Sequence, residues 1–394
     1  MTPVCGPPPR FRRNRPWLCL AGAALVLAGP ALAEPAFVQN GTAGFVVSDI
    51  KYALAQDDKA ASEVAGACPH GMSQNWVEIY EATPAGKRRK GESDKDYGER
   101  VERDSMQLAT ASDGRNLCMN PEAGAPDPHF RTLESSHIRA DGIPMDGGDT
   151  VRNQFFHVVG CSRSFQPTGL SNAFATEMLT GSWGILITLK GVHNLTNDKD
   201  VEVGIFANAD PIELSPDRKP LAYATYAVDQ DARFRARTHG HIENGVLTSD
   251  PVDFRFRSVV NGMHFERPLR HARLRATISA DGTLTGYLSG YTPVDDMYNF
   301  QFGYRNGTDN AGKPAPVPLR LHTGMGAARV LGYTCPGAYF ALQQYADGDR
   351  DPQTGRYTSI STQYRIAAIP ASVVDVPTQS TNATHGEKSA PHAQ

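Results

Sequence analysis

Hydrophobic and polar residues alternate in short runs through the middle and the end of the chain, and this alternation predicts β-strands. The runs recur about every 10–20 residues with turn-forming residues between them, which is typical of an antiparallel sandwich or jelly roll. No segment repeats at a fixed period, so propeller and solenoid folds are disfavoured. The expected strands are 155–159, 183–190, 201–206, 221–228, 233–243, 254–260, 274–279, 284–291 and 362–369.

The pattern changes along the chain and indicates three regions after the N-terminus. Residues 34–130 are mixed and rich in loop-forming residues, and we interpret them as an irregular α and loop extension. Residues 131–376 hold the expected strands and are interpreted as the β-sandwich domain. Residues 377–394 lack the apolar side chains needed for packing and are expected to be disordered.

Three segments of the extension have a pattern of their own. Residues 46–56 are expected to form a short helix, and residues 75–81 alternate like a strand. A basic run at 87–90 is followed by acidic residues up to Asp104. Such a charge run is typical of a solvated loop.

The first predicted hairpin joins strands 274–279 and 284–291. Leu274 and Ile278 must share the buried face with Leu284 and Leu288. A three-residue loop meets this requirement, with Gly282 in the left-handed conformation. The sequence therefore predicts the register of this hairpin as well as its position.

The second predicted hairpin turns at residues 261–262, an Asn-Gly pair. A two-residue turn there pairs Val260 with Met263. It also places Arg257 opposite Glu266, and these side chains are expected to form a cross-strand ion pair.

The first 33 residues have the pattern of a secretory signal peptide. Four arginines precede a short apolar run at 17–28, and the small residues at 31–33 match a cleavage site before Glu34. That run is too short to span a bilayer, and no later stretch is apolar for 18 residues. The sequence predicts a periplasmic or secreted protein without a transmembrane segment after the signal is removed.

The charge balance excludes one class of partner. The 394 residues include 39 Lys and Arg against 42 Asp and Glu. Loss of the four signal-peptide arginines leaves 35 basic against 42 acidic residues, a balance of −7. This bulk charge is unfavourable for a protein that coats nucleic acid.

Four cysteines remain after the signal, and in an oxidising compartment they predict two disulfide bonds. Three pairings are possible. Short loop closures favour Cys68 with Cys118 and Cys161 with Cys335. No C-x-x-C pair is present, so covalent c-type haem and a zinc ribbon are not supported.

Arginines occupy alternate positions of several predicted strands. If these strands share a sheet, the arginines decorate its outer face while apolar side chains fill the interior. A row of guanidinium groups can bind an acidic polysaccharide or lipopolysaccharide bidentately. The alternative interpretation is a solvated face paired with Asp and Glu from neighbouring strands. The candidate residues are Arg233, Arg235, Arg237, Arg255, Arg257, Arg273 and Arg275.

The turn after strand 233–243 complicates this face. A plain two-residue turn at 244–245 pairs Arg235 with Phe254, which mixes the two faces. A bulge near residues 250–251, an Asp-Pro pair, would restore arginine opposite arginine.

A second motif on the same strand suggests a transition metal. His239, His241 and Glu243 place three donors on one side of the strand, and imidazole with carboxylate suits zinc or another first-row divalent ion. The alternative is two histidines on a wet face among the arginines.

A third motif suggests calcium. Asp347, Asp349 and Asp351 place carboxylates at alternate positions of a loop, which matches the hard-ligand preference of calcium. The EF-hand pattern then needs Gly and Glu where this chain has Pro352 and Thr358. The alternative is a polar turn.

Asp146 and Asp149 form a further acidic pair, which is a candidate for general acid and base work in a glycosidase. Both lie in Asp-Gly-rich sequence that is also typical of turns. No G-x-S-x-G, P-loop, Rossmann or H-E-x-x-H motif is present, which lowers the expectation of the hydrolase and nucleotide chemistries that depend on them.

Several short segments together resemble parts of uncharacterised exported proteins of proteobacteria. They are 148–154 (Gly-Asp-Thr-Val-Arg-Asn-Gln), the Gly160-Cys161 pair, 68–71 (Cys-Pro-His-Gly) and 360–364 (Ile-Ser-Thr-Gln-Tyr). The resemblance implies an exported bacterial protein and implies no activity.

Three functions remain open at this point. The first is a non-catalytic module that binds a polyanionic envelope glycan through the arginine face. The second is a carbohydrate-active enzyme on a jelly roll, with calcium as a possible cofactor. The third is a structural component of an envelope complex. Only two tryptophans remain after the signal, which weakens the expectation of a platform for neutral sugars, although tyrosines can substitute for them. The candidate tyrosines are Tyr287, Tyr291, Tyr298 and Tyr304.

Overall fold

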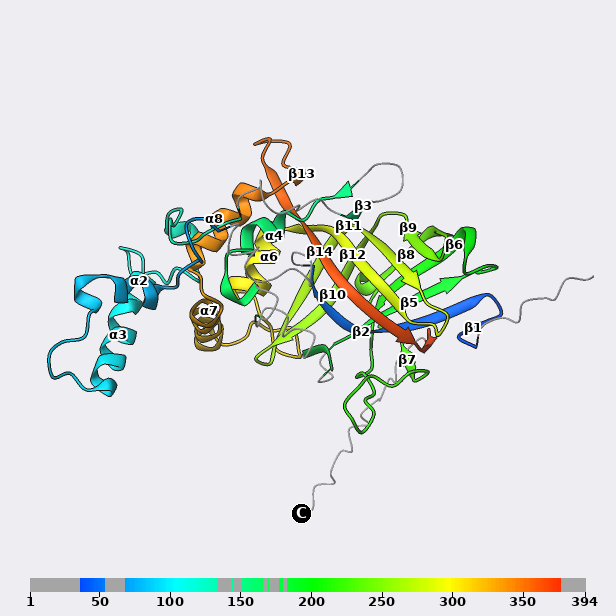
Figure 1. Cartoon of the computed structure of the whole chain (residues 1–394), viewed down its shortest axis with the longest axis horizontal. Helices are drawn as coiled ribbons and strands as arrows, with labels where there is room; N and C mark the ends of the chain where they lie inside the picture. Colours follow the sequence, from blue (N-terminus) through cyan, green and yellow to red (C-terminus); the bar gives the residue numbers. More distant parts are fainter. Residues whose placement is uncertain are drawn as a thin grey trace, which may run out of the picture. The chain divides into compact units, whose positions relative to one another are not determined.

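The computed structural model of the chain is shown in Figure 1. It describes residues 36–53, 68–133, 143–144, 150–165, 169, 177–179 and 183–376. All of these belong to one compact unit that begins at Pro35. The predicted signal peptide at 1–33, the predicted disordered tail at 377–394, and Asp146 and Asp149 lie outside the described residues.

Strands make up most of the regular structure. They are β1 (Val38–Gln39), β2 (Thr42–Tyr52), β3 (Ile143–Pro144), β4 (Thr150–Val151), β5 (Ile185–Lys190), β6 (Asn197–Ala207), β7 (Thr225–Ala227), β8 (Arg235–Glu243), β9 (Val246–Ser249), β10 (Val252–Val260), β11 (Met263–Ile278), β12 (Leu284–Pro293), β13 (Gly348–Arg350), β14 (Tyr357–Pro370) and β15 (Ser372–Val374). The α-helices are α2 (Trp76–Ala82), α3 (Asp94–Leu108), α4 (Gln154–Val159), α6 (Val294–Tyr298), α7 (Val317–Leu331) and α8 (Cys335–Tyr345). Short 3₁₀ or π segments are η1 (Pro84–Gly86), η2 (Pro121–Ala123), η3 (Arg163–Phe165), η6 (Ala232–Phe234) and η7 (Asn299–Gly303).

Eleven strands form one antiparallel sheet in the order β1-β2-β5-β6-β8-β9-β11-β12-β14-β13, with β10 paired to β11. Strand β2 pairs with both β5 and β14, so the sheet closes on itself through eight strands. Strands β2, β11, β12 and β14 all contribute buried side chains to one apolar core cluster. Figure 1 shows how these strands are arranged. The expected mainly β, antiparallel, sandwich-like fold is confirmed.

Both predicted hairpin registers are confirmed. Ile278 pairs with Leu284 across the first hairpin, and Gly282 has a φ of +85°. Val260 pairs with Met263 across the second. The ion pair predicted between Arg257 and Glu266 is wrong, because both side chains pair with other partners although their backbones are opposite.

The predicted helix at 46–56 is wrong, because residues 46–52 belong to strand β2; residues 54–56 lie outside the described residues. Phe45, Val46, Val47 and Ile50 are all buried there. Pairing with β5 on one side and β14 on the other satisfies the backbone of β2, and its β-branched residues suit a strand with neighbours on both edges. The weak helical pattern of the segment is overridden by tertiary pairing.

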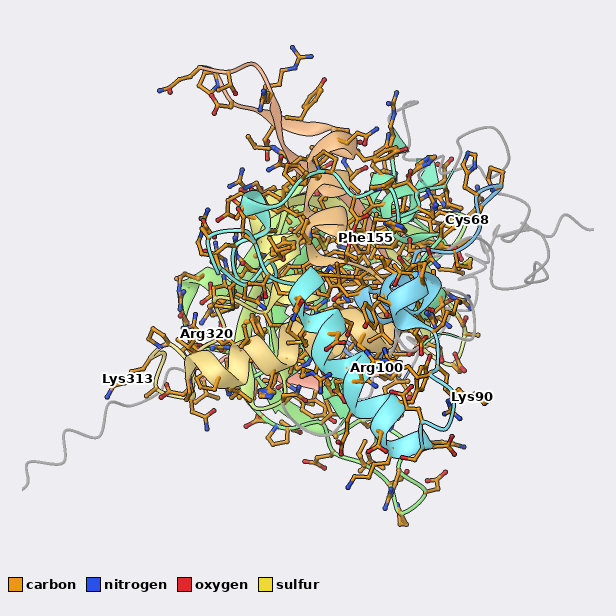
Figure 2. The ribbon with its side chains drawn as sticks, turned by 90° about the vertical axis from the view of Figure 1, so that its left-hand side faces the viewer. Cys68, Lys90, Arg100, Phe155, Lys313 and Arg320 are labelled. Atoms are coloured by element: carbon orange, nitrogen blue, oxygen red, sulfur yellow. A yellow bond between two sulfur atoms is a disulfide. The ribbon has the colours of Figure 1, made fainter. Side chains whose placement is uncertain are left out.

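The predicted strand at 75–81 is helix α2, and the predicted loop before Asp104 is largely helix α3. Asn75 and Glu78 form a capping box that starts α2, a signal that is readable in the sequence. Ser93 caps α3, where the buried Arg100 pairs with Glu92 at 2.7 Å. Figure 2 shows Arg100 on this helix.

The region from 131 to 370 also holds helices where only strands were expected. The predicted strand at 155–159 is helix α4, in which every residue from Phe155 to Val159 is buried. A short segment buried on all sides has no polar face, so its pattern does not distinguish helix from strand. Helices α7 and α8 had no predicted counterpart, and only Thr225–Ala227 of the strand expected at 221–228 is a strand.

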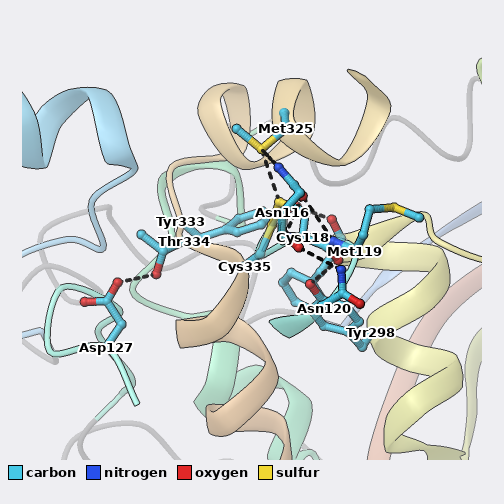
Figure 3. Close-up of a disulfide and its surroundings, with 11 residues drawn as sticks. Asn116, Cys118, Met119, Asn120, Asp127, Tyr298, Met325, Tyr333, Thr334 and Cys335 are labelled. Carbon is cyan, nitrogen blue, oxygen red and sulfur yellow. Dashed lines mark hydrogen bonds between the residues drawn. A yellow bond between two sulfur atoms is a disulfide. The ribbon is translucent and has the colours of Figure 1, made fainter. Parts of the chain in front are cut away.

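The disulfide pairing favoured by short closure is wrong. The bonds join Cys68 to Cys161 and Cys118 to Cys335, which are 93 and 217 residues apart in sequence. The second bond ties the start of α8 to the loop that holds Cys118, and the Tyr298 hydroxyl donates to the Cys118 carbonyl beside it (Figure 3). Long-range packing, rather than loop length, therefore selects the partners.

Candidate functional site

Strands β8, β10 and β11 do share one sheet, and their arginines lie on its outer face. Ala236 is buried between Arg235 and Arg237 of β8, and Phe256 is fully buried between Arg255 and Arg257 of β10. Arg233 lies in η6, directly before β8. Strand pairing differs from the expectation at residues 250–251. These two residues separate strand β9 from strand β10. Strand β9 pairs with β8 and β11, whereas β10 pairs with β11 alone. Arginine is therefore not placed opposite arginine by a bulge.

Five of the seven candidate arginines form a group that is balanced by carboxylates of this same chain. We call Arg233, Arg235, Arg237, Arg255 and Arg257 the paired patch. Their partners are Asp231 and Glu266 for Arg233, Asp375 for Arg235, Glu202 and Asp375 for Arg237, Glu266 for Arg255, and Asp229 for Arg257. These five residues match the alternative interpretation of a solvated, internally paired face.

The contacts within the paired patch are direct. Arg233 lies 2.6 Å from Glu266, and Arg257 lies 2.9 Å from Asp229. The Arg257 guanidinium also stacks over the Phe234 ring at 4.1 Å. An incoming anion must compete with these carboxylates, which weakens the patch as a binding surface.

Arg273 and Arg275 differ from the other five. Neither makes an ion pair with any residue that the structure describes, and the Nε atom of Arg275 is buried without a hydrogen-bond partner among them. Both side chains are partly exposed on the outer face of β11. They are therefore the two candidate arginines whose charge the described part of the chain does not balance.

Strand pairing extends these two arginines into a row across the sheet. Arg275 is opposite Tyr287 of β12, Tyr287 is opposite Arg365 of β14, and Arg365 is opposite Lys51 of β2. Residues directly opposite on antiparallel strands lie on the same face, with Cβ atoms about 5 Å apart. We call Lys51, Arg365, Tyr287, Arg275 and the adjacent Arg273 the cationic row.

The surroundings of the cationic row are suited to an external ligand. Tyr287 is 37% exposed, which is high for a large aromatic side chain. Arg365 is exposed, and Lys51 makes no ion pair with a described residue. The exposed Asp49 lies two residues from Lys51 on the same strand. Arg275 and Arg365 thus flank one aromatic ring on the two adjacent strands, and Lys51 and Asp49 lie on the next strand beyond Arg365.

Sequence reasoning missed Lys51 and Arg365. Lys51 was placed in a predicted helix, and Arg365 is a single cation in the predicted strand 362–369. Only the pairing of β14 with β12 and β2 brings them beside Arg275. The alternation of residues along β14 predicts that Arg365 points outward. It does not predict which residues of the neighbouring strands lie beside Arg365.

The predicted metal motifs do not form donor clusters. No group of three His, Cys, Asp or Glu side chains that could hold a metal ion is found among the described residues. His239 instead contacts Asp200 at 2.7 Å, and this carboxylate raises the pKa of His239. His241 and Glu243 lie further along the same face of β8.

The three aspartates of the calcium motif have separate partners. Asp347 accepts hydrogen bonds from Ser361, Asp349 pairs with Arg270 at 3.0 Å, and Asp351 accepts from backbone N–H groups of its own turn. Asp351 and its turn correspond to the alternative interpretation of a polar turn. Among the candidate tyrosines, Tyr298 and Tyr304 are buried, while Tyr287 and Tyr291 lie at the surface or beside a cavity.

Comparison of the chain with protein-family models, with curated proteins and with solved structures finds no match. Among the described residues, no helix is long and apolar enough to cross a membrane. The two disulfide bonds fit an extracellular or periplasmic location.

Proposed function

We propose that this protein is an exported, non-catalytic module that binds an anionic glycan of the cell envelope through the cationic row. The observation that supports the proposal is the alignment of Lys51, Arg365, Tyr287 and Arg275 on four adjacent strands. The predicted signal peptide and the two disulfides support export.

The geometry of the row suits a chain that crosses the strands. Neighbouring strands of a sheet lie about 4.8 Å apart, so Arg365 and Lys51 lie on adjacent strands, and Arg275 lies two strands from Arg365 with Tyr287 between them. Carboxylate, sulfate or phosphate groups along a glycan can then each meet a cation, and arginine can hold them bidentately. The exposed ring of Tyr287 offers an apolar surface for the sugar ring between two charges.

The net charge of the chain disfavours nucleic acid as the ligand, and the carboxylates of the paired patch disfavour that patch as the site. The chain without its first 33 residues has a balance of −7, so attraction is confined to a local surface rather than spread over the molecule. The paired patch has its own carboxylates and gains less from a bound anion. The catalytic and structural alternatives have no comparable support from the described residues.

The test is affinity for polygalacturonate of the double variant Lys51→Glu with Arg275→Glu. Each reversal removes one attraction and adds one repulsion, so we expect the affinity to fall at least about tenfold, which corresponds to roughly 1.4 kcal/mol. The matched control is Lys95→Glu with Arg103→Glu, which changes net charge equally on the exposed face of α3. We expect the control to stay within about twofold of the wild type.

Equal losses in the two double variants would show that only net charge matters and would overturn the proposal. Unchanged binding in the Lys51 and Arg275 variant would also overturn it. Circular dichroism before the assay confirms that both double variants are folded, which is expected because all four side chains are at least partly exposed.

A further inference from the structure

Two cavities lie side by side where helix α8 meets the hairpin formed by β13 and β14. Their volumes are about 500 and 880 Å³, and both are lined by Gln344, Ala346 and Tyr357. Cavities of this size are typical of small-molecule sites. We propose that the smaller one, here called the tyrosine cleft, binds a neutral saccharide unit. No residue of the cationic row lines this cleft, which recognises hydroxyl groups and ring faces instead of charge.

The lining of the tyrosine cleft combines aromatic rings with hydrogen-bonding groups of both kinds. Its main residues are Arg152, Gln154, Tyr291, Tyr345, Asp347 and Tyr357. Sugar hydroxyls both donate and accept hydrogen bonds, so they need donors and acceptors together. The apolar face of a sugar ring needs an aromatic surface. The cleft supplies all three.

Asp347 is the fixed acceptor of the cleft. Its two carboxylate oxygens accept hydrogen bonds from the backbone N–H and the hydroxyl of Ser361, each at 2.8 Å. The Ser361 hydroxyl in turn accepts from the backbone N–H of Gln154 at 3.0 Å. A carboxylate oxygen can accept more than one bond, so Asp347 keeps acceptor capacity for ligand hydroxyls.

The tyrosine rings are also held in place by contacts outside the cleft. Tyr345 stacks on His157 with an interplanar angle of 6°, and its hydroxyl lies 3.2 Å from the Thr132 hydroxyl. Arg350 lies over the Tyr357 ring at 4.7 Å and donates to its hydroxyl at 3.2 Å. Rings that are fixed before binding lose little conformational freedom on binding, which favours affinity.

Other ligand classes fit the cleft less well. A bound anion would lie against the Asp347 carboxylate, and a bound cation would lie against the Arg152 guanidinium. A purely apolar ligand would cover the Asp347, Gln154 and Gln344 polar groups without replacing their hydrogen bonds to water. A hydroxyl-rich neutral ring avoids each of these costs.

The experiment is calorimetric titration of the full chain with four neutral hexasaccharides, built from glucose, galactose, mannose and N-acetylglucosamine. We expect at least one to bind, with an affinity that changes less than twofold between 50 and 500 mM salt, about the range in which exposed charge interactions become screened. Asp347→Asn should weaken that binding at least about tenfold, because it removes charge-assisted hydrogen bonds.

Asp347→Asn also alters the hydrogen bonds to Ser361, and this variant could lose its fold. A second variant therefore tests the cleft independently. Tyr357 is 42% exposed, and Tyr357→Ala should weaken binding about tenfold while the protein stays folded. The control is Arg275→Glu in the cationic row, which should leave neutral hexasaccharide binding within twofold.

Failure of all four hexasaccharides to bind at millimolar concentration overturns the proposal. Binding that Tyr357→Ala and Asp347→Asn both leave intact overturns it as well. Neither result bears on polygalacturonate binding by the row.

Discussion

The paired patch and the cationic row contain the same residue type on the outer face of the same sheet, yet their electrostatic situations are opposite. In the patch, Glu266 serves two arginines and Asp375 serves two more. In the row, Lys51, Arg273 and Arg275 have no ion pair with a described residue. Cations along one strand therefore indicate little about binding until the residues opposite on neighbouring strands are known.

The difference arises from which strands are neighbours. The arginines of β8 and β10 lie near carboxylates from other segments. These carboxylates include Asp229 and Asp231 in the segment before β8, and Glu266 on β11. Strands β11, β12, β14 and β2 place a tyrosine and further cations in register with Arg275. One sheet thus pairs five arginines with its own carboxylates and leaves Arg273 and Arg275 without an ion pair to a described residue.

The largest effect is expected away from both arginine surfaces, at the Cys118–Cys335 bond. Replacing both cysteines with serine should lower the free energy of unfolding by about 2–5 kcal/mol, because the bond closes a long loop. Urea unfolding measures this loss. Since the bond ties α8 and not the row, polygalacturonate affinity of the folded variant should stay within twofold. A large loss of affinity in folded protein would show that the row depends on the helical end.

The next effect concerns the aromatic member of the row. Tyr287→Ala should weaken polygalacturonate binding about fivefold, or roughly 1 kcal/mol, because it removes the surface between two cations. Tyr357→Ala, in the tyrosine cleft, is the matched control and should leave this binding unchanged. Microscale thermophoresis compares the two variants. If they behave alike, Tyr287 has no special part in the row.

A smaller effect should convert part of the paired patch into a surface like the row. Glu266→Gln keeps the size of the side chain and removes the carboxylate shared by Arg233 and Arg255. We expect polygalacturonate affinity to rise two- to threefold and the free energy of unfolding to fall by less than about 1 kcal/mol. Glu99→Gln, on the exposed face of α3, is the control. No gain in affinity would mean that Arg233 and Arg255 cannot reach a bound chain.

The smallest effect is a dependence on pH below 4. A hydrogen bond from Arg233 keeps the pKa of Asp231 below its ordinary value, and a hydrogen bond from Gln230, with Arg235, does the same for Asp375. Stabilisation by a carboxylate with a lowered pKa is present above the ordinary pKa and is lost as pH falls through the lowered one. Protonation then frees arginines of the patch.

Retention on dextran sulfate, which stays charged in acid, should therefore increase slightly as the pH falls from 5 to 3. The Lys51→Ala with Arg275→Ala variant, which adds no titrating group, should show the same increase from a lower starting level, because the increase comes from the patch. If this variant shows no increase in retention, the increase in the wild type comes from the row and not from the patch.

The sequence predicted much of the sheet and little of what covers it. Alternation found the strands around Phe256 and Leu274, and the turn residues gave two hairpin registers, because both signals are local. The capping box of α2 was present but was outweighed by the apparent alternation of 75–81. Helix α4 is buried on all sides and so has no face to detect.

The site was predictable only in part for the same reason. The outward direction of Arg273 and Arg275 follows from a period of two along β11. Unlike Arg233 and Arg257, they have no carboxylate partner among the described residues. This difference depends on strand neighbours that are far apart in sequence, such as Lys51 and Arg365. The disulfide partners are also set by such long-range packing.

The salt dependence of polygalacturonate binding is the most direct test of the cationic row as the binding surface. Each cation that contacts the glycan adds to the slope of log Kd against log salt concentration, because binding releases counterions. We expect Lys51→Ala and Arg275→Ala each to make the slope shallower, while Arg233→Ala in the paired patch leaves it at the wild-type value. A shallower slope for Arg233→Ala, with unchanged slopes for Lys51→Ala and Arg275→Ala, would contradict the assignment.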